Sequence, residues 1–188
     1  PWKIMVAFIL ITAALSAFLD NVTTVLLVGP MTITIARILK VNPVPFLITQ
    51  IIASNIGGTA TLIGDPPNIM IGSAAGLDFM DFLCNTGVAV IFILLATVIM
   101  MRFIYKSQLS AEREAIEAVM ELDENKAIED RSLLHKSIVM IILVVIGFVF
   151  HGQIGLESAT ISLTAAAVML LVGRQNIDYI ISEVEWST

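Results

Sequence analysis

Long apolar runs separated by short polar stretches make up most of the chain. Apolar runs occupy residues 2–19, 25–39, 82–105, 133–150 and 156–172. Two shorter runs, 46–53 and 69–75, flank a polar stretch at 54–68. A helix needs about 20 apolar residues to cross a bilayer, so the longer runs predict membrane-spanning helices. The pattern therefore predicts an all-α, polytopic membrane protein.

Residues 46–75 predict one membrane-crossing helix that is broken in its middle. Each apolar half is too short to cross alone, but the two halves and the polar middle make about one crossing. Gly57-Gly58 destabilises helix and Pro66-Pro67 lacks two N–H donors, so we expect no regular helix through 54–68. Broken backbone inside a bilayer is tolerated where it is buried in protein or lines a watery cavity, and carriers bind solutes there. The alternative is a loop between two buried helices of a soluble protein.

Residues 2–39 predict a helical hairpin with its tip at residues 20–24. Thr12, Ser16 and Asp20 are spaced by four, which places them in one polar stripe on the first arm. A carboxylate at bilayer depth is costly unless it is paired, hydrated or ion-bound, so Asp20 indicates a Na⁺ or proton site. If the hairpin spans the membrane fully, Asp20-Asn21 is instead a solvated turn.

Several polar side chains of the broken stretch have two open interpretations. They either contact a substrate or only hydrogen-bond the broken backbone, and they are Asn55, Thr59, Thr61 and Asn68. Asp65 lies just before the second half-helix. It either caps the positive end of that helix or contacts a substrate or proton directly.

Composition and charge agree with this topology. The chain is 57% hydrophobic with a mean hydropathy of +0.94, above the level of soluble domains. If the open end of the hairpin faces the cytoplasm, the predicted crossings place all 10 Lys and Arg residues on that side. We therefore expect a multi-pass protein of the cell (plasma or inner) membrane. Its parts are residues 1–106, an acidic cytoplasmic linker at 107–132, and two transmembrane helices within 133–188.

The sequence offers little for catalysis. Its one cysteine, Cys84, excludes an internal disulfide. No phosphate-binding Gly-Lys-Ser/Thr pattern, His/Cys metal cluster or Ser/His/Asp triad is recognisable, which argues against an ATP-driven pump and against an enzyme. We expect no cofactor, no metal beyond Na⁺ and no nucleic-acid partner. The expected partners are the lipid bilayer, a small ion and the remainder of a longer parent chain.

Two stretches, 15–24 and 55–68, resemble signature segments of the ion transporter superfamily. That group includes the citrate and dicarboxylate carriers, the arsenite permeases and the melanosomal P protein. The resemblance covers the whole chain as a middle fragment, and residues 184–188 resemble the opening of the helix before a second hairpin. It implies a re-entrant hairpin, one broken transmembrane helix and three further transmembrane helices. It also implies two inverted repeats, an elevator-type secondary carrier and a homodimer.

The resemblance also implies site residues. The Na⁺ site of the dicarboxylate branch corresponds here to Ser16, Asp20 and Asn21, with backbone around Gly57 and Gly58. The expected substrate contacts are Asn21, Thr23, Thr24, Asn55, Thr59, Thr61, Asp65 and Asn68. This sequence departs from that branch, because Asp20 replaces the motif's Ser, Val22 its Thr, and Asp65 a Thr. These departures favour the arsenite-permease and P-protein side and make proton coupling more plausible.

The resulting hypothesis is a secondary active transporter of a small ion. The solute would be an anion such as arsenite or a carboxylate, coupled to Na⁺ or H⁺. The alternatives are a channel-like permease and a membrane scaffold that does not transport. Because half of the expected site is missing, we do not expect this fragment to transport alone.

Overall fold

The computed structural model describes residues 1–109, 111, 113–120, 130–156, 158–173 and 180. Every regular element among these residues is a helix, as the sequence predicts. The chain divides into two compact units, Pro1–Leu122 and Asp123–Thr188. The division falls inside the stretch predicted to be a linker.

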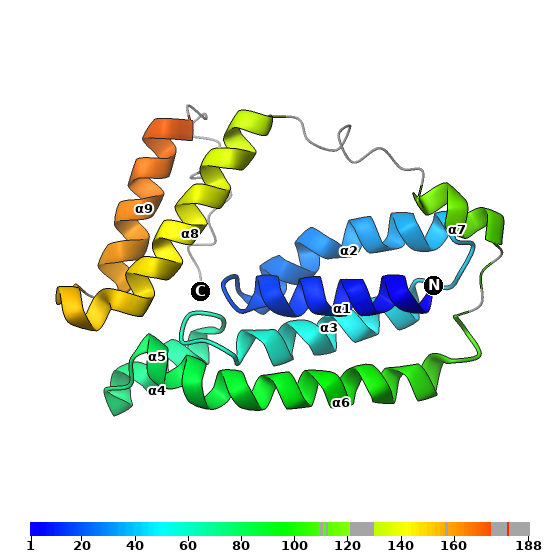
Figure 1. The fold of residues 1–188 in the computed structure, drawn as a ribbon, viewed down its shortest axis with the longest axis horizontal. Coiled ribbons are helices and arrows are strands. Elements are labelled where there is room, and N and C mark those ends of the chain that lie inside the picture. Colours follow the sequence, from blue (N-terminus) through cyan, green and yellow to red (C-terminus); the bar gives the residue numbers. More distant parts are fainter. Residues whose placement is uncertain (110, 112, 121–129, 157, 174–179, 181–188) are drawn as a thin grey trace. The chain divides into compact units, whose positions relative to one another are not determined.

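Unit 1 contains most of the helices. Its elements are α1 (Trp2–Ser16), α2 (Asn21–Ile38), α3 (Val44–Gly58), α4 (Pro66–Ala75), α5 (Phe79–Phe82), the π-helical turn η1 (Leu83–Gly87), α6 (Val88–Tyr105) and α7 (Arg113–Met120). Helices α1, α2, α3 and α6 lie side by side (Figure 1), with α1 packed mainly on α3. Their contact buries an apolar core that includes Met5, Ile9, Phe46, Ala53 and Met101.

The predicted helix break is present, but it begins later than expected. The chain is not helical from residue 59 to residue 65. The prediction that Gly57-Gly58 lie outside regular helix is wrong, because both belong to the last turn of α3. With 15 residues, α3 is about 22 Å long, short of a hydrocarbon layer of about 30 Å. If the first residue of α3 lies at the surface of the apolar layer, the break that follows the helix lies inside that layer.

The predicted hairpin is also present. Helix α1 has 15 residues and ends at Ser16, and α2 begins at Asn21 after a turn of four residues. Since α1 is as short as α3, the hairpin tip and the helix break lie at a similar level. In the described part of the chain, three helices are long and apolar enough to span a bilayer, and α2, with 18 residues, is the first of them.

The second of these helices is Phe79–Tyr105, which combines α5, η1 and α6. Asp78 caps it, and the side chains of Asp78 and Asp81 bond each other's backbone N–H in a capping box. The π-helical turn was not predicted. The side chains of Asn85 and Thr86 donate to carbonyls four residues earlier, at 2.7 Å each.

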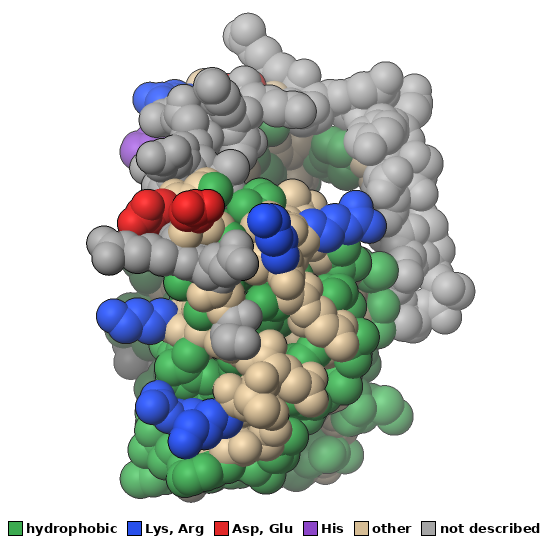
Figure 2. Space-filling view, turned by 90° about the vertical axis from the view of Figure 1, so that its right-hand side faces the viewer, with side chains coloured by type: hydrophobic (Ala, Val, Ile, Leu, Met, Phe, Trp, Pro, Cys, Tyr) green, Lys and Arg blue, Asp and Glu red, His purple; other side chains and the backbone are tan. Residues whose placement is uncertain are grey.

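One end of unit 1 is basic. The start of α1 and the ends of α2 and α6 lie together there, so Lys3, Arg37 and Arg102 share one end of the bundle (Figure 1). Figure 2 looks onto this end and shows Lys and Arg side chains gathered on it. The hairpin tip and the helix break lie at the other end of the same helices. This arrangement agrees with the predicted clustering of basic residues on one side of the membrane.

Unit 2 is a pair of packed helices, α8 (Arg131–Ile154) and α9 (Ser158–Gly173). Helix α8 continues to Ile154, beyond the end of the apolar run at residue 150, and the chain reverses at Gly155 with a φ of 71°. Residues 131–150 form the third candidate span, whereas α9 belongs to the shorter apolar helices. The predicted end at 173–176 is described only at Gly173, and residues 184–188 lie outside the described residues.

Candidate functional site

The hairpin and the broken helix meet through glycine. A Cβ on Gly57 would overlap the backbone of Ala13, and one on Gly58 would overlap the Asn21 side chain. A Cβ on Gly64, inside the break, would lie 2.8 Å from the Ser16 carbonyl oxygen. At Gly57 and Gly64 the obstacle is backbone, and at Gly58 it is the Asn21 side chain that bonds Ser16 and Asp65. The glycines therefore serve close packing of the tip on the break.

Two predicted site residues hold the broken backbone together. The Asn68 amide donates to the carbonyl oxygens of Gly58 and Thr61, both at 2.9 Å. The Thr61 hydroxyl donates to the Ala17 carbonyl at the hairpin tip and accepts from the Gly64 N–H. Both side chains are buried. Of the two interpretations left open by the sequence, the structure shows hydrogen bonding of the broken backbone for Asn68 and Thr61.

Asn21 is the residue at which the tip and the break exchange polar contacts. Its Oδ1 accepts from the Ser16 hydroxyl at 2.7 Å, and its Nδ2 donates to Asp65 Oδ2 at 3.1 Å. The same Nδ2 lies 3.4 Å from Asn55 Oδ1. Reversing the amide would place its oxygen against two other oxygens, so this orientation is the favourable one. Four of the predicted residues thus converge: Ser16, Asn21, Asn55 and Asp65.

The Ser16 hydroxyl faces more acceptors than it has protons. Its oxygen lies 2.7 Å from Asn21 Oδ1 and 2.8 Å from the Ser54 carbonyl oxygen. One hydroxyl proton can be donated to one of these oxygens at a time. Three oxygen atoms therefore lie together in a buried place with one proton between them, an arrangement that a small cation would stabilise.

The two carboxylates of the site have different surroundings. Asp20 is the N-cap of α2, and its Oδ1 accepts the backbone N–H groups of Val22 and Thr23 at 3.0 and 2.9 Å. Asp65 occupies the N-cap position of α4 but its side chain does not cap that helix. It bonds Asn21 instead, so the capping interpretation of Asp65 is wrong, and its contact with a substrate or proton stays a prediction.

The remaining predicted residues lie around this centre. Thr23 is exposed, and the exposed Thr59 donates to the Ile56 carbonyl at 2.8 Å. The carbonyls of Gly57 and Gly58 accept from Ala60 N–H and Asn68, each at 2.9 Å. Each carbonyl retains a second lone pair for another partner. Their predicted role as ion ligands stays a prediction.

Two buried polar residues between the helices, Gln50 and Thr32, were not predicted, whereas the buried Thr12 and Thr24 belong to the predicted polar stripe and the predicted substrate contacts. Gln50 in α3 is fully buried, and its Nε2 donates to Thr32 of α2 at 2.5 Å. Among the described residues, three buried side-chain oxygens have no hydrogen-bond partner: Thr12 Oγ1, Thr24 Oγ1 and Gln50 Oε1. Gln50 and Ser54 are spaced by four and therefore lie on one polar face of α3. This spacing is the sequence signal that could have indicated Gln50 as a buried polar residue.

A groove beside Asn21 provides access to the centre. Its volume is about 300 Å³, and it lies between α2 and α3. Polar Asn21, Ser54 and Asn55 share it with apolar side chains of both helices. A solute in this groove would therefore touch the same atoms that join the tip to the break.

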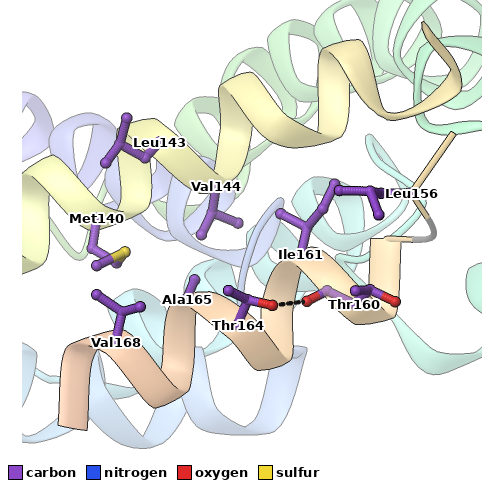
Figure 3. A pocket seen from close by; sticks show the side chains of 9 residues that line it. All are labelled: Met140, Leu143, Val144, Leu156, Thr160, Ile161, Thr164, Ala165 and Val168. Carbon is purple, nitrogen blue, oxygen red and sulfur yellow. Dashed lines mark hydrogen bonds between the residues drawn. The ribbon is translucent and has the colours of Figure 1, made fainter. Parts of the chain in front are cut away.

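The other large cavity, about 310 Å³, lies between α8 and α9 and is apolar. Figure 3 shows its lining, in which Thr160 and Thr164 carry the polar groups. The Thr164 hydroxyl donates to the Thr160 carbonyl of its own helix at 2.7 Å. This cavity has no charged group among its lining residues and does not resemble an ion site.

Comparisons with known proteins show which proteins this chain is similar to. The sequence model of the citrate transporter family (CitMHS) matches residues 1–188. The "Uncharacterized transporter Rv2685" of Mycobacterium tuberculosis is 42% identical over 189 residues, covering 100% of this chain and 44% of the relative. The "46 kDa membrane protein" of Mycobacterium leprae is 36% identical over 188 residues, with the same coverage. The human P protein is 41% identical over 123 residues, 63% of this chain and 15% of the relative. The chain thus spans less than half the length of these relatives.

Proposed function

Because this chain belongs to the citrate transporter family, we propose that its parent protein is a secondary active transporter of a small ion. The hairpin tip and the helix break would supply one part of the binding site. The substrate would be an anion such as arsenite or a carboxylate, moved by an elevator-type motion. The parent would act as a homodimer with the 107–132 stretch on the cytoplasmic side. The relatives named as transporters support the general activity, and the geometry of the site supports the finer proposal.

The observation that carries the proposal is the oxygen cluster at Ser16. The oxygen Oγ of Ser16 lies within hydrogen-bond distance of both Asn21 Oδ1 and the Ser54 carbonyl oxygen. These three oxygen atoms share one hydroxyl proton. Carbonyl groups at broken helices are typical ligands of Na⁺ in carriers. A Na⁺ ion ligated here would join α1, α2 and α3, and its arrival would fix the tip against the break.

The charge of the site supports binding of a cation before an anion. Asp20 and Asp65 flank the cluster, whereas Lys3, Arg37 and Arg102 lie at the opposite end of the helices. An anionic substrate approaching the empty site would meet two carboxylates. A bound Na⁺, or a proton on one carboxylate, would reduce this repulsion. The cation would therefore bind before the anionic substrate, and this order of binding would couple their transport.

The test is uptake by the full-length parent in proteoliposomes. Arsenite and citrate are offered separately, each with an imposed Na⁺ or proton gradient. We expect uptake against the substrate gradient, and we expect Ser16→Ala and Asn21→Ala to raise the half-saturating Na⁺ concentration. The rise should be about tenfold or more, since loss of one such contact costs on the order of 1–3 kcal/mol.

Two controls separate the site from general damage. Ser73→Ala removes an exposed hydroxyl of α4, and Asn85→Ala removes an exposed amide of η1, and both should leave uptake unchanged. Uptake that never exceeds equilibrium would indicate a channel. A further outcome is that Asp20→Asn leaves uptake unchanged while Ser16→Ala abolishes the Na⁺ dependence of uptake. That result would show that Na⁺ is the coupling ion and that the Asp20 carboxylate is not needed to bind it. Unchanged Na⁺ dependence in Ser16→Ala would overturn the proposed site.

A further inference from the structure

A small cavity opens at the basic end of unit 1, far along the helices from the oxygen cluster. Its volume is about 120 Å³, and it is lined by Trp2, Arg102, Lys106 and Leu109. Trp2 begins α1, whereas Arg102 lies in the last turn of α6 and Lys106 follows that helix. The cavity therefore lies where the ends of two membrane helices meet.

The lining is apolar on one side and cationic on the other. Leu109 is buried in the core of the bundle, and Trp2 packs against the same core. Arg102 and Lys106 are exposed and four residues apart, so they lie on one face of the chain. No carboxylate lines the cavity among the residues that the structure describes. Its walls thus present two cations above an apolar floor.

The Arg102 guanidinium lies over the Trp2 ring. Its central carbon lies 5.5 Å from the centroid of the Trp2 ring. A cation over an aromatic ring is attracted by the electron-rich ring face, and this attraction leaves the five N–H donors of the guanidinium unused. Those donors remain able to bind phosphate oxygens in the bidentate manner typical of arginine. Lys106 adds a second positive charge within one helical turn.

We propose that this cavity binds the phosphate group of an anionic phospholipid from the leaflet at the basic end. Tryptophan and basic residues at helix ends are typical of the membrane–water interface. Basic pockets between membrane helices on that side bind anionic headgroups. The apolar floor favours a lipid over free phosphate, because it would contact the glycerol and the first methylenes of the acyl chains. The proposal does not depend on which solute the parent carries.

The test uses the full-length parent purified from a mixture of phosphatidylglycerol and phosphatidylcholine. Native mass spectrometry would count the lipids that each protein molecule retains. We expect preferential retention of phosphatidylglycerol. The pair Arg102→Gln and Lys106→Gln should lower it on the order of tenfold, since each basic residue near an anionic surface contributes to attraction.

A charge-matched control is available at the same end of the bundle. Lys3→Gln with Arg37→Gln removes the same charge from exposed residues that do not line the cavity. This control should retain most of the phosphatidylglycerol, and Arg102→Lys should retain an intermediate amount because it keeps the charge but loses the bidentate donors of the guanidinium. Lys106→Gln alone, a change at an exposed helix end, serves if the double variant does not fold.

Three results would overturn the proposal. The first is equal loss in the cavity variants and the charge-matched control, which would indicate only general attraction to an anionic surface. The second is retention that no cavity variant changes. The third is displacement of phosphatidylglycerol by millimolar inorganic phosphate, which would identify a free-anion site instead.

Discussion

The two units of the chain are built from helices of similar apolar character but use polar residues differently. In unit 1, polar side chains are buried where helices meet, among them Ser16, Gln50, Thr61 and Asn68. In the described part of unit 2, no polar side chain is fully buried, and apolar side chains such as Leu163 and Leu171 are more than two-thirds exposed. Among the residues that the structure describes, a break in a membrane helix occurs in unit 1 and not in unit 2.

The difference follows from where backbone groups find partners. An unbroken helix satisfies its own N–H and C=O groups, so α8 and α9 need only apolar contacts. The break at 59–65 leaves backbone groups that side chains must satisfy: Asn68 donates to the carbonyls of Gly58 and Thr61, and the Thr61 hydroxyl accepts from the Gly64 N–H. Unit 1 should therefore tolerate few substitutions at its helix contacts, and unit 2 should tolerate many.

The largest effect is expected for Gly57→Ala. The new methyl group would overlap backbone atoms of Ala13, which cannot turn aside as a side chain can. We expect a destabilisation of about 3 kcal/mol, the upper end for overpacking, measured as the shift in thermal unfolding of the parent in detergent.

Gly147→Ala in α8 is the matched control in unit 2. Its methyl group would lie 2.9 Å from Ile161 Cγ2, a side chain that can move. The gain in helix propensity, about 1 kcal/mol, should offset most of the cost. Equal destabilisation by the two substitutions would remove the distinction between the units.

A smaller effect is expected for Asn68→Leu. The change leaves the buried carbonyls of Gly58 and Thr61 without their side-chain donor. An unsatisfied buried group costs about 1–3 kcal/mol, so we expect a loss within that range. Asn85→Leu, which removes a bond from an exposed amide, should change the unfolding midpoint little. A harmless Asn68→Leu would show that water can replace the amide.

The smallest effects are expected for a pair of Thr→Val changes. Thr61→Val removes a buried hydroxyl that bonds two separate backbone segments, and should cost about 1–2 kcal/mol. Thr164→Val removes a hydroxyl that bonds only its own helix, and should stay within about 0.5 kcal/mol. Urea unfolding of the parent, followed by intrinsic tryptophan fluorescence, would measure both. A larger loss of stability for Thr164→Val than for Thr61→Val would show that polar contacts also stabilise unit 2.

The pattern of apolar runs predicted the hairpin, the break and the helices around them. It could not predict that Gly57-Gly58 remain helical, because local propensity is overridden there by packing on Ala13, a residue more than 40 positions away. The π-helical turn at Leu83–Gly87 likewise has no signal in an apolar run. The continuation of α8 past His151 was missed because the polar residues after the apolar run favoured a turn.

The candidate site was predictable only in part. The polar residues of the two signature stretches identified Ser16, Asn21, Asn55 and Asp65, which the structure brings together. Ser54 contributes its backbone carbonyl, which accepts from the Ser16 hydroxyl. Every residue has such a carbonyl, so the identity of residue 54 could not predict this contact. The pair of Gln50 and Thr32 escaped notice because both lie inside runs assigned to lipid-facing or core helix.

The three glycines at the crossing limit how this region can be probed. Cysteine placed at position 57, 58 or 64 would carry a Cβ into occupied space, so labelling there would report distorted protein rather than solvent access. Asn55 and Thr59 are exposed on the rim of the same region and offer sites for reporter groups. Spectroscopic labels at those two positions would follow the opening of the tip against the break without wedging the helices apart.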